Sequence, residues 1–263
     1  MLMKERSFYL NEVKRIARDA SQIIMDIYLN ESQWNVVEKA DLSPLTIADQ
    51  KSNDFICREL NLLDPSIPII SEENKEIPYE QRKDFDLFWL VDPLDGTKEF
   101  IKRNGEFTVN IALIQGGYPV LGVIVVPASG VLYFAEVGKG AYKIEGEMLL
   151  SISCRTFHLD DSHLKIVASR SHLSVETSQY INRFHEAEIV SKGSSLKFMM
   201  LAEGAADLYP RLSPIMEWDS AAAQIIVEEA GGSIRIFETG ERMYYNKISL
   251  VQPSFIAAAN CLP

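Results

Sequence analysis

Two stretches near the start of the chain carry apolar residues at helical spacing. This pattern is typical of amphipathic helices that pack one face on a core. The first helix is expected to end near Asn30, and its apolar positions are Val13, Ile16, Ala17, Ala20, Ile23, Ile24 and Ile27. The second follows Thr46-Ile47-Ala48-Asp49 and runs through Phe55, Ile56, Leu60 and Leu63. Asp49 is therefore predicted to lie near a helix start.

The pattern then changes to short apolar runs that predict β-strands. A strand over residues 68–71 leads directly into Glu72-Glu73, and a strand over residues 88–91 leads directly into Asp92. The following segment is typical of an antiparallel meander with turns at Gly116-Gly117 and Ser129-Gly130. Its strands are predicted over residues 108–115, 118–126, 131–135 and 141–144. Acidic residues thus end both strands that precede the meander.

From about residue 150 onward, short strands alternate with helices. Strands are predicted over residues 166–168, 189–190 and 207–209, and helices over residues 175–184, 195–203 and 219–230. We therefore predict two subdomains, an α+β unit over residues 1–150 and an α/β unit over residues 151–263. The join near residues 145–160 is not linker-like, so the two units are expected to share a tight interface, which is a usual place for an active site.

Charge and cysteine content narrow the function classes. The formal net charge of −11 argues against a general nucleic-acid or membrane-surface binder, and no basic run offsets it. The widely spaced Cys57, Cys154 and Cys261 fit a reduced compartment better than a zinc site or a disulfide framework. No apolar run approaches a membrane span, and the N-terminus lacks the order of a signal peptide. We expect a cytoplasmic protein, in which an anionic substrate needs a local positive centre such as a metal.

The segment Asp92-Pro93-Leu94-Asp95-Gly96-Thr97 places two carboxylates in one turn at the end of an apolar strand. Carboxylates this close repel one another and lose hydration, so they need a proton or a cation between them. Oxygen ligands alone favour a hard metal, Mg²⁺ before Ca²⁺ or Mn²⁺. The alternative is an ordinary Asp-Gly turn with a capping Asp.

Other acidic residues can join this turn, and each has a plainer interpretation. Glu72 and Glu73 can be a solvated loop, Asp219 can be the N-cap of the following helix, and Asp49 can be a solvated helix-start residue. Thr97 can be a simple first-turn residue of a short helical pattern. If Gly96 and Thr97 instead present free backbone N–H groups, they suit an anion such as phosphate.

Taken together, three segments resemble the paired signatures of the inositol monophosphatase superfamily over nearly the whole chain. They are Glu72-Glu73, residues 89–97, and Trp218-Asp219-Ser220-Ala221-Ala222 followed by Glu228 to Gly232. The resemblance implies a layered αβαβα sandwich, a phosphatase that needs two or three Mg²⁺ ions, and inhibition by Li⁺.

The resemblance also implies roles for individual residues. The implied Mg²⁺ ligands are Glu72, Asp92, the Leu94 carbonyl, Asp95 and Asp219, with Glu73 as a supporting carboxylate. Thr97, hydrogen-bonded to Asp49, is implied to orient the attacking water, so Asp49, Glu72 and Thr97 form the expected catalytic group. The expected contacts to the substrate phosphate involve Glu72, Leu94, Asp95, Gly96, Thr97 and Asp219.

The stretch from Ser194 to Arg211 carries the information on substrate. Inositol monophosphatases have a glutamate at the position of Arg211, and a guanidinium there favours a second anionic group over a neutral polyol. The chain is most similar to the CysQ-type 3′(2′),5′-bisphosphate nucleotidases, in which Ser194, Lys197 and Arg211 match residues near the nucleotide. Alternatively, Lys197 is a solvated lysine, and Arg211 pairs with Asp207 or Glu217.

The expected activity is Mg²⁺-dependent removal of the 3′-phosphate of adenosine 3′,5′-bisphosphate to give AMP, with the 5′-sulfated analogue (PAPS) as a further possible substrate. Two alternatives stay open: an inositol or other sugar phosphatase, and a catalytically silent metal- or partner-binding protein of the same fold. A homodimer is possible. Peripheral membrane association has no supporting helix or basic patch in the sequence.

Overall fold

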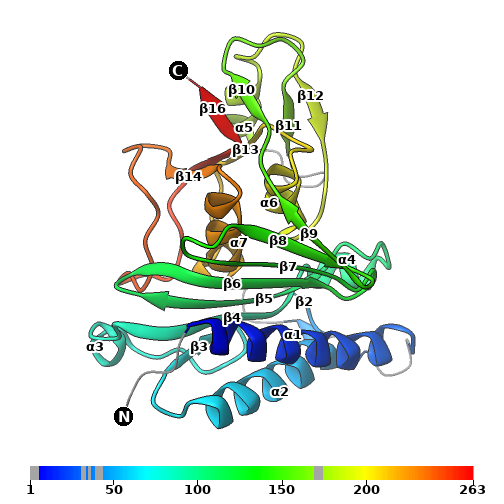
Figure 1. The fold of residues 1–263 in the computed structure, drawn as a ribbon, viewed down its shortest axis with the longest axis vertical. Helices are drawn as coiled ribbons and strands as arrows, with labels where there is room; N and C mark the ends of the chain where they lie inside the picture. The colour runs from blue at the N-terminus through cyan, green and yellow to red at the C-terminus, as the bar shows by residue number, and fades with distance from the viewer. Residues whose placement is uncertain (1–5, 31–33, 35–36, 39–43, 169–173, 263) are drawn as a thin grey trace.

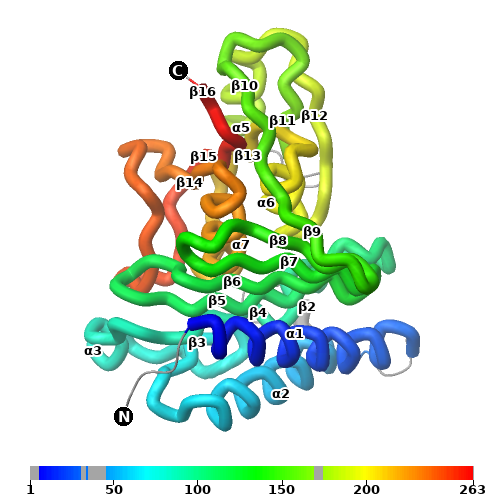
Figure 2. The backbone as a smooth tube through the Cα atoms, in the orientation of Figure 1, coloured from blue at the N-terminus to red at the C-terminus, as the bar shows by residue number. Residues whose placement is uncertain are grey.

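Helices and sheets alternate in five layers in the computed structural model of this chain (Figure 1). The structure describes residues 6–30, 34, 37–38, 44–168 and 174–262. Figure 2 shows that the paired helices near the N-terminus lie on the far side of the large sheet from the C-terminal part of the chain. None of the described helices has the length and continuous apolar sequence that a membrane crossing requires.

The first of the two large sheets has seven strands in the order β3-β4-β5-β6-β7-β8-β9. Only β3 and β4 are parallel, and the remaining neighbours are antiparallel. The strands are β3 (Ile69–Ser71), β4 (Leu87–Asp95), β5 (Thr108–Gln115), β6 (Tyr118–Val126), β7 (Val131–Glu136), β8 (Ala141–Glu145) and β9 (Met148–Ile152). The long central strands β5 and β6 are buried almost throughout, because helices cover both faces of the sheet.

One face of this sheet is covered by α1 (Arg6–Tyr28) and α2 (Ile47–Leu63). The predicted apolar stripe of α1 is buried, including Val13, Ile16 and Ala20, and it packs with Trp89 and Val91 of β4 in one apolar cluster. The helix α2 also contacts β4. The Ser52 hydroxyl of α2 donates a hydrogen bond to the Pro93 carbonyl of β4 over 2.8 Å.

The opposite face of the sheet carries α7 (Glu217–Glu229) and, beside it, α6 (Leu196–Ala202). Close approach of α7 depends on Gly122 in β6, because a Cβ at this position would lie 2.5 Å from the Ala222 carbonyl oxygen and 2.5 Å from Cγ2 of Ile225. The backbone of β6 therefore lies directly against α7, and this contact fixes the height of the helix above the sheet.

Beyond α6 and α7 lies the second sheet, in the order β12-β11-β13-β15-β14, with α5 (Val175–Ile181) on its outer face. Its strands are β11 (Lys165–Val167), β12 (Glu188–Val190), β13 (Leu208–Arg211), β14 (Ser233–Ile236) and β15 (Phe255–Ala258). The smaller elements are β1 (Val37–Glu38), β2 (Pro44–Leu45), α3 (Tyr79–Arg82), α4 (Thr97–Ile101), β10 (Thr156–His158) and β16 (Asn260–Leu262).

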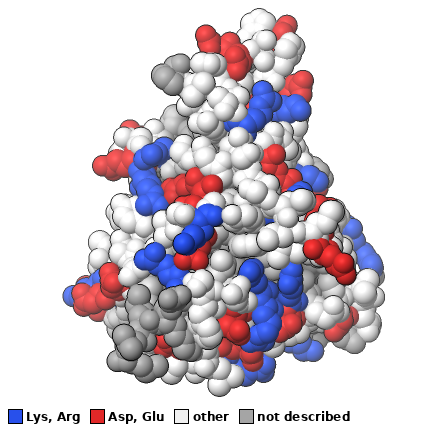
Figure 3. Space-filling model, viewed as in Figure 1, with Lys and Arg blue, Asp and Glu red and all other residues white. Residues whose placement is uncertain are grey.

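The predicted αβαβα sandwich is confirmed. The strands predicted over residues 108–115 and 118–126 have the observed bounds, and both early helices are present. The prediction missed β9, β10, β14, β15 and β16, which extend or flank the two sheets. The division at residue 150 stays a prediction, although β9 carries the first sheet to Ile152. Basic and acidic side chains are interspersed on the face shown in Figure 3.

Candidate active site

The parallel pairing of β3 with β4 brings two acidic residues to one sheet edge. Ser71 pairs with Val91, and the Glu72 N–H continues the ladder by donating to the Val91 carbonyl over 3.2 Å. Glu72, the first residue after β3, and Asp92, in β4, therefore lie side by side. Glu72 is partly exposed in the turn that follows β3.

The end of β4 is folded around the first of its two carboxylates, Asp92. Oδ1 of Asp92 accepts the Leu94 N–H over 3.1 Å, and the pairing of β4 with β5 shifts register between Asp92 and Asp95. Asp92 and Leu94 are buried, whereas Asp95 and Gly96 are partly exposed. The bulge is therefore a feature of the site that re-aims Asp95 relative to Asp92.

The first turn of α7 supplies the third carboxylate. Glu72, Asp92 and Asp219 each offer an oxygen within 4.8 Å of the others. Asp219 is the third residue of α7, and Oδ2 of its side chain accepts the Met216 N–H over 2.9 Å. The alternative interpretation of Asp219 as the N-cap is wrong, because Met216 occupies that position.

These carboxylates raise one another's pKa in the absence of a cation. Burial raises the pKa of Asp92 well above its usual range, and the charges of Glu72, Asp95 and Asp219 raise it further. The pKa of Asp219 rises to about 8, first through burial and then through the charges of Asp95 and Glu72. The group therefore holds protons at neutral pH unless a cation replaces them.

The donor set fits a hard divalent cation. It consists of carboxylate oxygens from separate segments, and Asp95 stands close enough to influence the pKa of both Asp92 and Asp219. Such an all-oxygen set suits Mg²⁺ or a similar ion. The interpretation of residues 92–97 as an ordinary capped turn does not explain why three carboxylates converge here.

Beside the acidic group, a hydroxyl is bonded to a buried carboxylate. The Thr97 hydroxyl lies 2.9 Å from Oδ1 of Asp49, and Oδ2 of Asp49 accepts both the Thr46 N–H over 2.8 Å and the Thr46 hydroxyl over 2.6 Å. Asp49 is buried, so its interpretation as a solvated residue is wrong. Burial raises the pKa of Asp49, and these hydrogen bonds oppose the rise.

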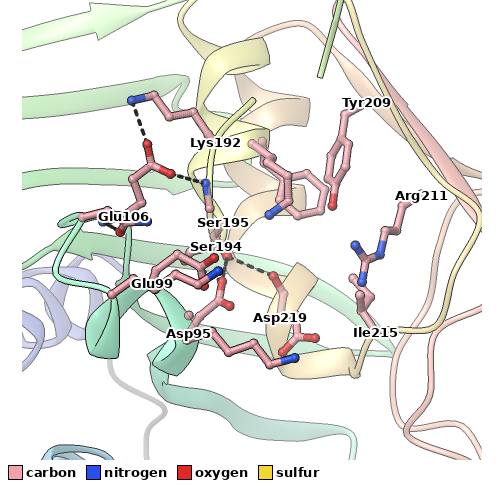
Figure 4. A pocket seen from close by; sticks show the side chains of 17 residues that line it. Asp95, Glu99, Glu106, Lys192, Ser194, Ser195, Tyr209, Arg211, Ile215 and Asp219 are labelled. Atoms are coloured by element: carbon pink, nitrogen blue, oxygen red, sulfur yellow. Dashed lines mark hydrogen bonds and ion pairs between the residues drawn. The ribbon is translucent and has the colours of Figure 1, made fainter. Parts of the chain in front are cut away.

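A cavity of about 420 Å³ opens beside the carboxylates, and an adjoining hollow of about 420 Å³ contains Glu72, Thr97 and Asp219. In Figure 4, Tyr209 and Arg211 stand on one side of the cavity, and Glu99 and Glu106 stand on the other. Lys197 also lines it, half-buried, with its Nζ 5.8 Å from the Tyr209 ring centroid. Burial lowers the pKa of Lys197, so its interpretation as a solvated lysine is wrong.

Arg211 is held by main-chain groups of its own loop. Its Nε donates to the Ser213 carbonyl over 3.2 Å, and one Nη donates to the Pro214 carbonyl over 3.3 Å. The two acidic partners considered from the sequence are engaged elsewhere, since Asp207 pairs with Arg155 and Glu217 pairs with Lys247. The guanidinium therefore reaches the cavity as a cation without either of those two partners.

The predicted site residue Ser194 contributes its hydroxyl to a polar network around Asp95. Oδ2 of Asp95 accepts from the hydroxyls of Ser194 over 2.7 Å and Ser195 over 2.8 Å. Asn110 Nδ2 approaches the same oxygen at 3.4 Å, and Thr108 bonds Ser194 over 2.6 Å. The sequence analysis missed Ser195, Asn110 and Thr108. The available signal was Asn110, a polar residue inside the apolar run of residues 109–114.

The structure thus gathers predicted residues from distant segments around one opening. Asp49, Glu72, Asp92, Asp95 and Thr97 come from the first part of the chain, and Ser194, Lys197, Arg211 and Asp219 come from the second. Leu94 and Gly96 lie in the turn that joins Asp92 to Thr97, and Gly96 has φ +94°. The orientation of the Leu94 carbonyl toward an ion stays a prediction.

The chain is similar to known proteins along nearly its whole length. Residues 6–260 match the model of the inositol monophosphatase family. The chain is 43% identical over 246 residues to the 3′(2′),5′-bisphosphate nucleotidase CysQ of Escherichia coli K12, covering 94% of this chain and 98% of that protein.

The chain is also similar to solved structures. CysQ of Bacteroides thetaiotaomicron, a bacterial member of the inositol monophosphatase family, is 43% identical, with a TM-score of 0.84 over 95% of this chain and 97% of that chain. An inositol monophosphatase (IMPase) of Thermotoga maritima shares the fold at 23% identity, with a TM-score of 0.78 over 96% of this chain and 92% of that chain.

Proposed function

The chain belongs to the inositol monophosphatase family and is a phosphatase, and from this premise we propose that it hydrolyses the 3′-phosphate of adenosine 3′,5′-bisphosphate to give AMP and phosphate. The observation that carries the proposal is the position of Arg211 and Lys197 in the cavity beside the carboxylates. A substrate with two separate anionic groups matches this arrangement, because one group meets the acidic site through a cation and the other meets the two basic side chains.

Members of this family are generally metal-dependent. We propose that Glu72, Asp92, the Leu94 carbonyl, Asp95 and Asp219 hold two or three Mg²⁺ ions. Bound there, Mg²⁺ supplies a Lewis acid that lowers the pKa of water and neutralises phosphate charge. The carboxylates are suited to this role because burial and then mutual repulsion raise the pKa values of Asp92 and Asp219, so that an ion relieves an unfavourable arrangement.

Thr97 and Asp49 are proposed to orient the attacking water. The Thr97 hydroxyl has a single proton, and Asp49 accepts it. The Thr97 oxygen can therefore act toward a water only as an acceptor, so the water donates one proton to Thr97 and keeps its lone pairs free. Asp49 is fixed in turn by two hydrogen bonds from Thr46, so the acceptor is already in position before substrate binds.

The remaining substrate contacts are also proposals. Gly96 allows the turn to approach Ser194 closely, because a Cβ at Gly96 would lie 3.2 Å from Cβ of Ser194. Both the Gly96 turn, which is proposed to bind phosphate, and Ser194 line the same cavity. Lys197 and Arg211 supply the positive charge, and a bound anion would offset the burial that lowers the pKa of Lys197.

The test is Mg²⁺-dependent phosphate release from a small panel of phosphoesters. For the wild type, kcat/KM for adenosine 3′,5′-bisphosphate is expected to exceed that for inositol 1-phosphate by at least about a hundredfold. Arg211→Glu is expected to narrow or reverse this ratio, whereas Arg211→Lys retains the charge and loses only the bidentate contact. Equal wild-type kcat/KM values for the two substrates would contradict the substrate assignment.

The same panel addresses the other proposals. PAPS and fructose 1,6-bisphosphate test the sulfated nucleotide and the sugar phosphatase alternative. Absence of release from every phosphoester would favour the catalytically silent alternative. We further propose inhibition by Li⁺, a cytoplasmic location and a possible homodimer. The panel in the presence of LiCl, cell fractionation and sedimentation in solution test these three statements in turn.

A further inference from the structure

Ser195 is a buried serine at a helix N-cap whose hydroxyl does not cap its helix. It immediately precedes α6, it is 1% exposed, and its side chain makes no cap hydrogen bond. Serine is favoured at this position because its oxygen normally accepts a first-turn N–H. The usual local reason for a serine is therefore absent here, and the hydroxyl is used elsewhere.

The hydroxyl contacts both parts of the acidic site. It lies 2.8 Å from Oδ2 of Asp95, at the end of β4, and 3.1 Å from the main-chain carbonyl of Asp219, in the first turn of α7. Figure 4 shows these bonds converging between the two aspartates. One oxygen atom thus connects two proposed metal ligands that are separated by more than a hundred residues in sequence.

Asn110 fixes the direction of this connection. Its Oδ1 accepts the Thr108 hydroxyl over 2.9 Å, which assigns Nδ2 as the donor to Ser195 over 2.9 Å. Because Asn110 donates to the Ser195 oxygen, the single proton of Ser195 is directed to Asp95 or to the Asp219 carbonyl. The chain of donors therefore runs from β5 to Ser195 and on to one of these two acceptors, of which Asp95 is nearer.

Asp95 is bonded asymmetrically as a result. Ser194, Ser195 and Asn110 all approach Oδ2, and among the described residues no hydrogen bond is recorded to Oδ1. Partners that occupy one oxygen orient the carboxylate and leave the other oxygen available to an ion. Because the Ser195 hydroxyl contacts both Asp95 and the Asp219 carbonyl, it also links the end of β4 to the first turn of α7.

We propose that Ser195, supported by Asn110, is a positioning residue that sets Asp95 relative to Asp219 for metal binding. It acts through Asp95 and requires no contact with the reacting atoms. The inference rests on the proposed metal-dependent function. Its central measurement, however, is ion binding without substrate, so that failure of the nucleotidase assignment would leave the test intact.

The experiment measures Mg²⁺ binding by calorimetry in the full-length protein without substrate. Ser195→Ala is expected to raise the Mg²⁺ Kd by about tenfold, the lower range found when a hydrogen-bond partner of a metal ligand is removed. At saturating Mg²⁺, KM for the nucleotide is expected to stay within about twofold, because no substrate contact is lost. An unchanged Mg²⁺ Kd in the folded variant overturns the proposal.

Two further variants separate positioning from stability. Ser220→Ala removes another buried serine hydroxyl, bonded to Gln252 and close to Tyr245, and is expected to leave the Mg²⁺ Kd unchanged. Asn110→Leu removes the donor behind Ser195 and provides an independent test should Ser195→Ala fail to fold. If the residues act as one chain, the double variant binds Mg²⁺ no more weakly than Ser195→Ala alone. Additive effects, or an equal loss in Ser220→Ala, contradict the positioning role.

Discussion

The N-terminal ends of α2 and α7 are built in the same way and face different surroundings. Each has an aspartate as its third residue, Asp49 or Asp219, and each aspartate accepts the N–H of the N-cap residue. The Asp49 carboxylate receives two hydroxyls, those of Thr46 and Thr97. The Asp219 carboxylate instead lies within 4.8 Å of Glu72 and Asp92 oxygens.

The difference shows that the local helix-start pattern does not determine the chemistry of the aspartate. In both helices the main-chain bond fixes the carboxylate in space, as a capping aspartate usually does. What each side chain meets there is decided by packing between distant segments. Burial raises the pKa of both carboxyl groups. Hydrogen-bond donors around Asp49 oppose the rise and suit an acceptor in a hydrogen-bond relay, whereas the charges of Asp95 and Glu72 add to the rise at Asp219 and favour a proton or a cation there.

Among the changes at the two helix ends, Asp219→Asn is expected to have the largest effect on activity and on Mg²⁺ binding. The amide retains the size of the side chain and loses the charge that attracts an ion. Lewis-acid stabilisation contributes several kcal/mol, so kcat/KM is expected to fall by about a thousandfold or more and the Mg²⁺ Kd to rise sharply. Steady-state assays and calorimetry measure these two quantities. Retained turnover at ordinary Mg²⁺ concentrations would remove Asp219 from the proposed ligand set.

Asp49→Asn is the matched change at the other helix and is expected to have a smaller and different effect. The amide can still face Thr97, but it no longer requires the Thr97 proton, so water orientation is weakened. We expect kcat to fall by about a hundredfold, within the range for loss of a proton-accepting group, with the Mg²⁺ Kd unchanged. A large change in the Mg²⁺ Kd of Asp49→Asn would show that Asp49, like Asp219, takes part in ion binding.

The pH dependence of stability is expected to give the smallest effect. Burial and the charges of Asp95 and Glu72 raise the pKa of Asp219 in the folded, metal-free protein to about 8, well above its ordinary value of 3.8. Stability from this group is therefore present at low pH and is lost as pH rises toward 8. We expect the Tm of the metal-free protein to fall between pH 6 and about 8, and saturating Mg²⁺ to reduce that fall.

The same melting curves extend to both asparagine variants. Asp219→Asn is expected to lose the Mg²⁺-dependent part of the slope, whereas Asp49→Asn is expected to retain it. Identical slopes with and without Mg²⁺ in the wild type would contradict the assignment of Asp219 as a group that exchanges a proton for a cation.

Apolar periodicity predicted the elements whose burial follows a simple rule. β5 and β6 are almost fully buried, and α1 buries one stripe, so their sequences carry the pattern. β9 was missed because Met148, Leu149 and Leu150 form a continuous apolar run that remains largely exposed at the sheet edge. β14 is a short strand with an exposed charged residue, so its sequence does not distinguish it from a loop.

The acidic residues of the site were recognisable because their spacing is local and their chemistry is unusual. The polar network behind them was not, since the bond between Asn110 and Ser195 joins segments 85 residues apart. Nothing in the neighbourhood of Ser195 distinguishes it from an ordinary N-cap. The packing of α6 against α7, together with the hydrogen bond from Asn110, holds that hydroxyl beside Asp95.

Gly122, in the middle of β6, affects the position of a site residue that it does not contact. It contacts neither the carboxylates nor the cavity, but any side chain there would lift α7 from the sheet and carry Asp219 with it. Natural selection for the charge at residue 219 therefore also acts on the absence of a side chain at residue 122. A list of residues that touch the substrate would omit this position, although a single codon change here displaces the helix that carries Asp219.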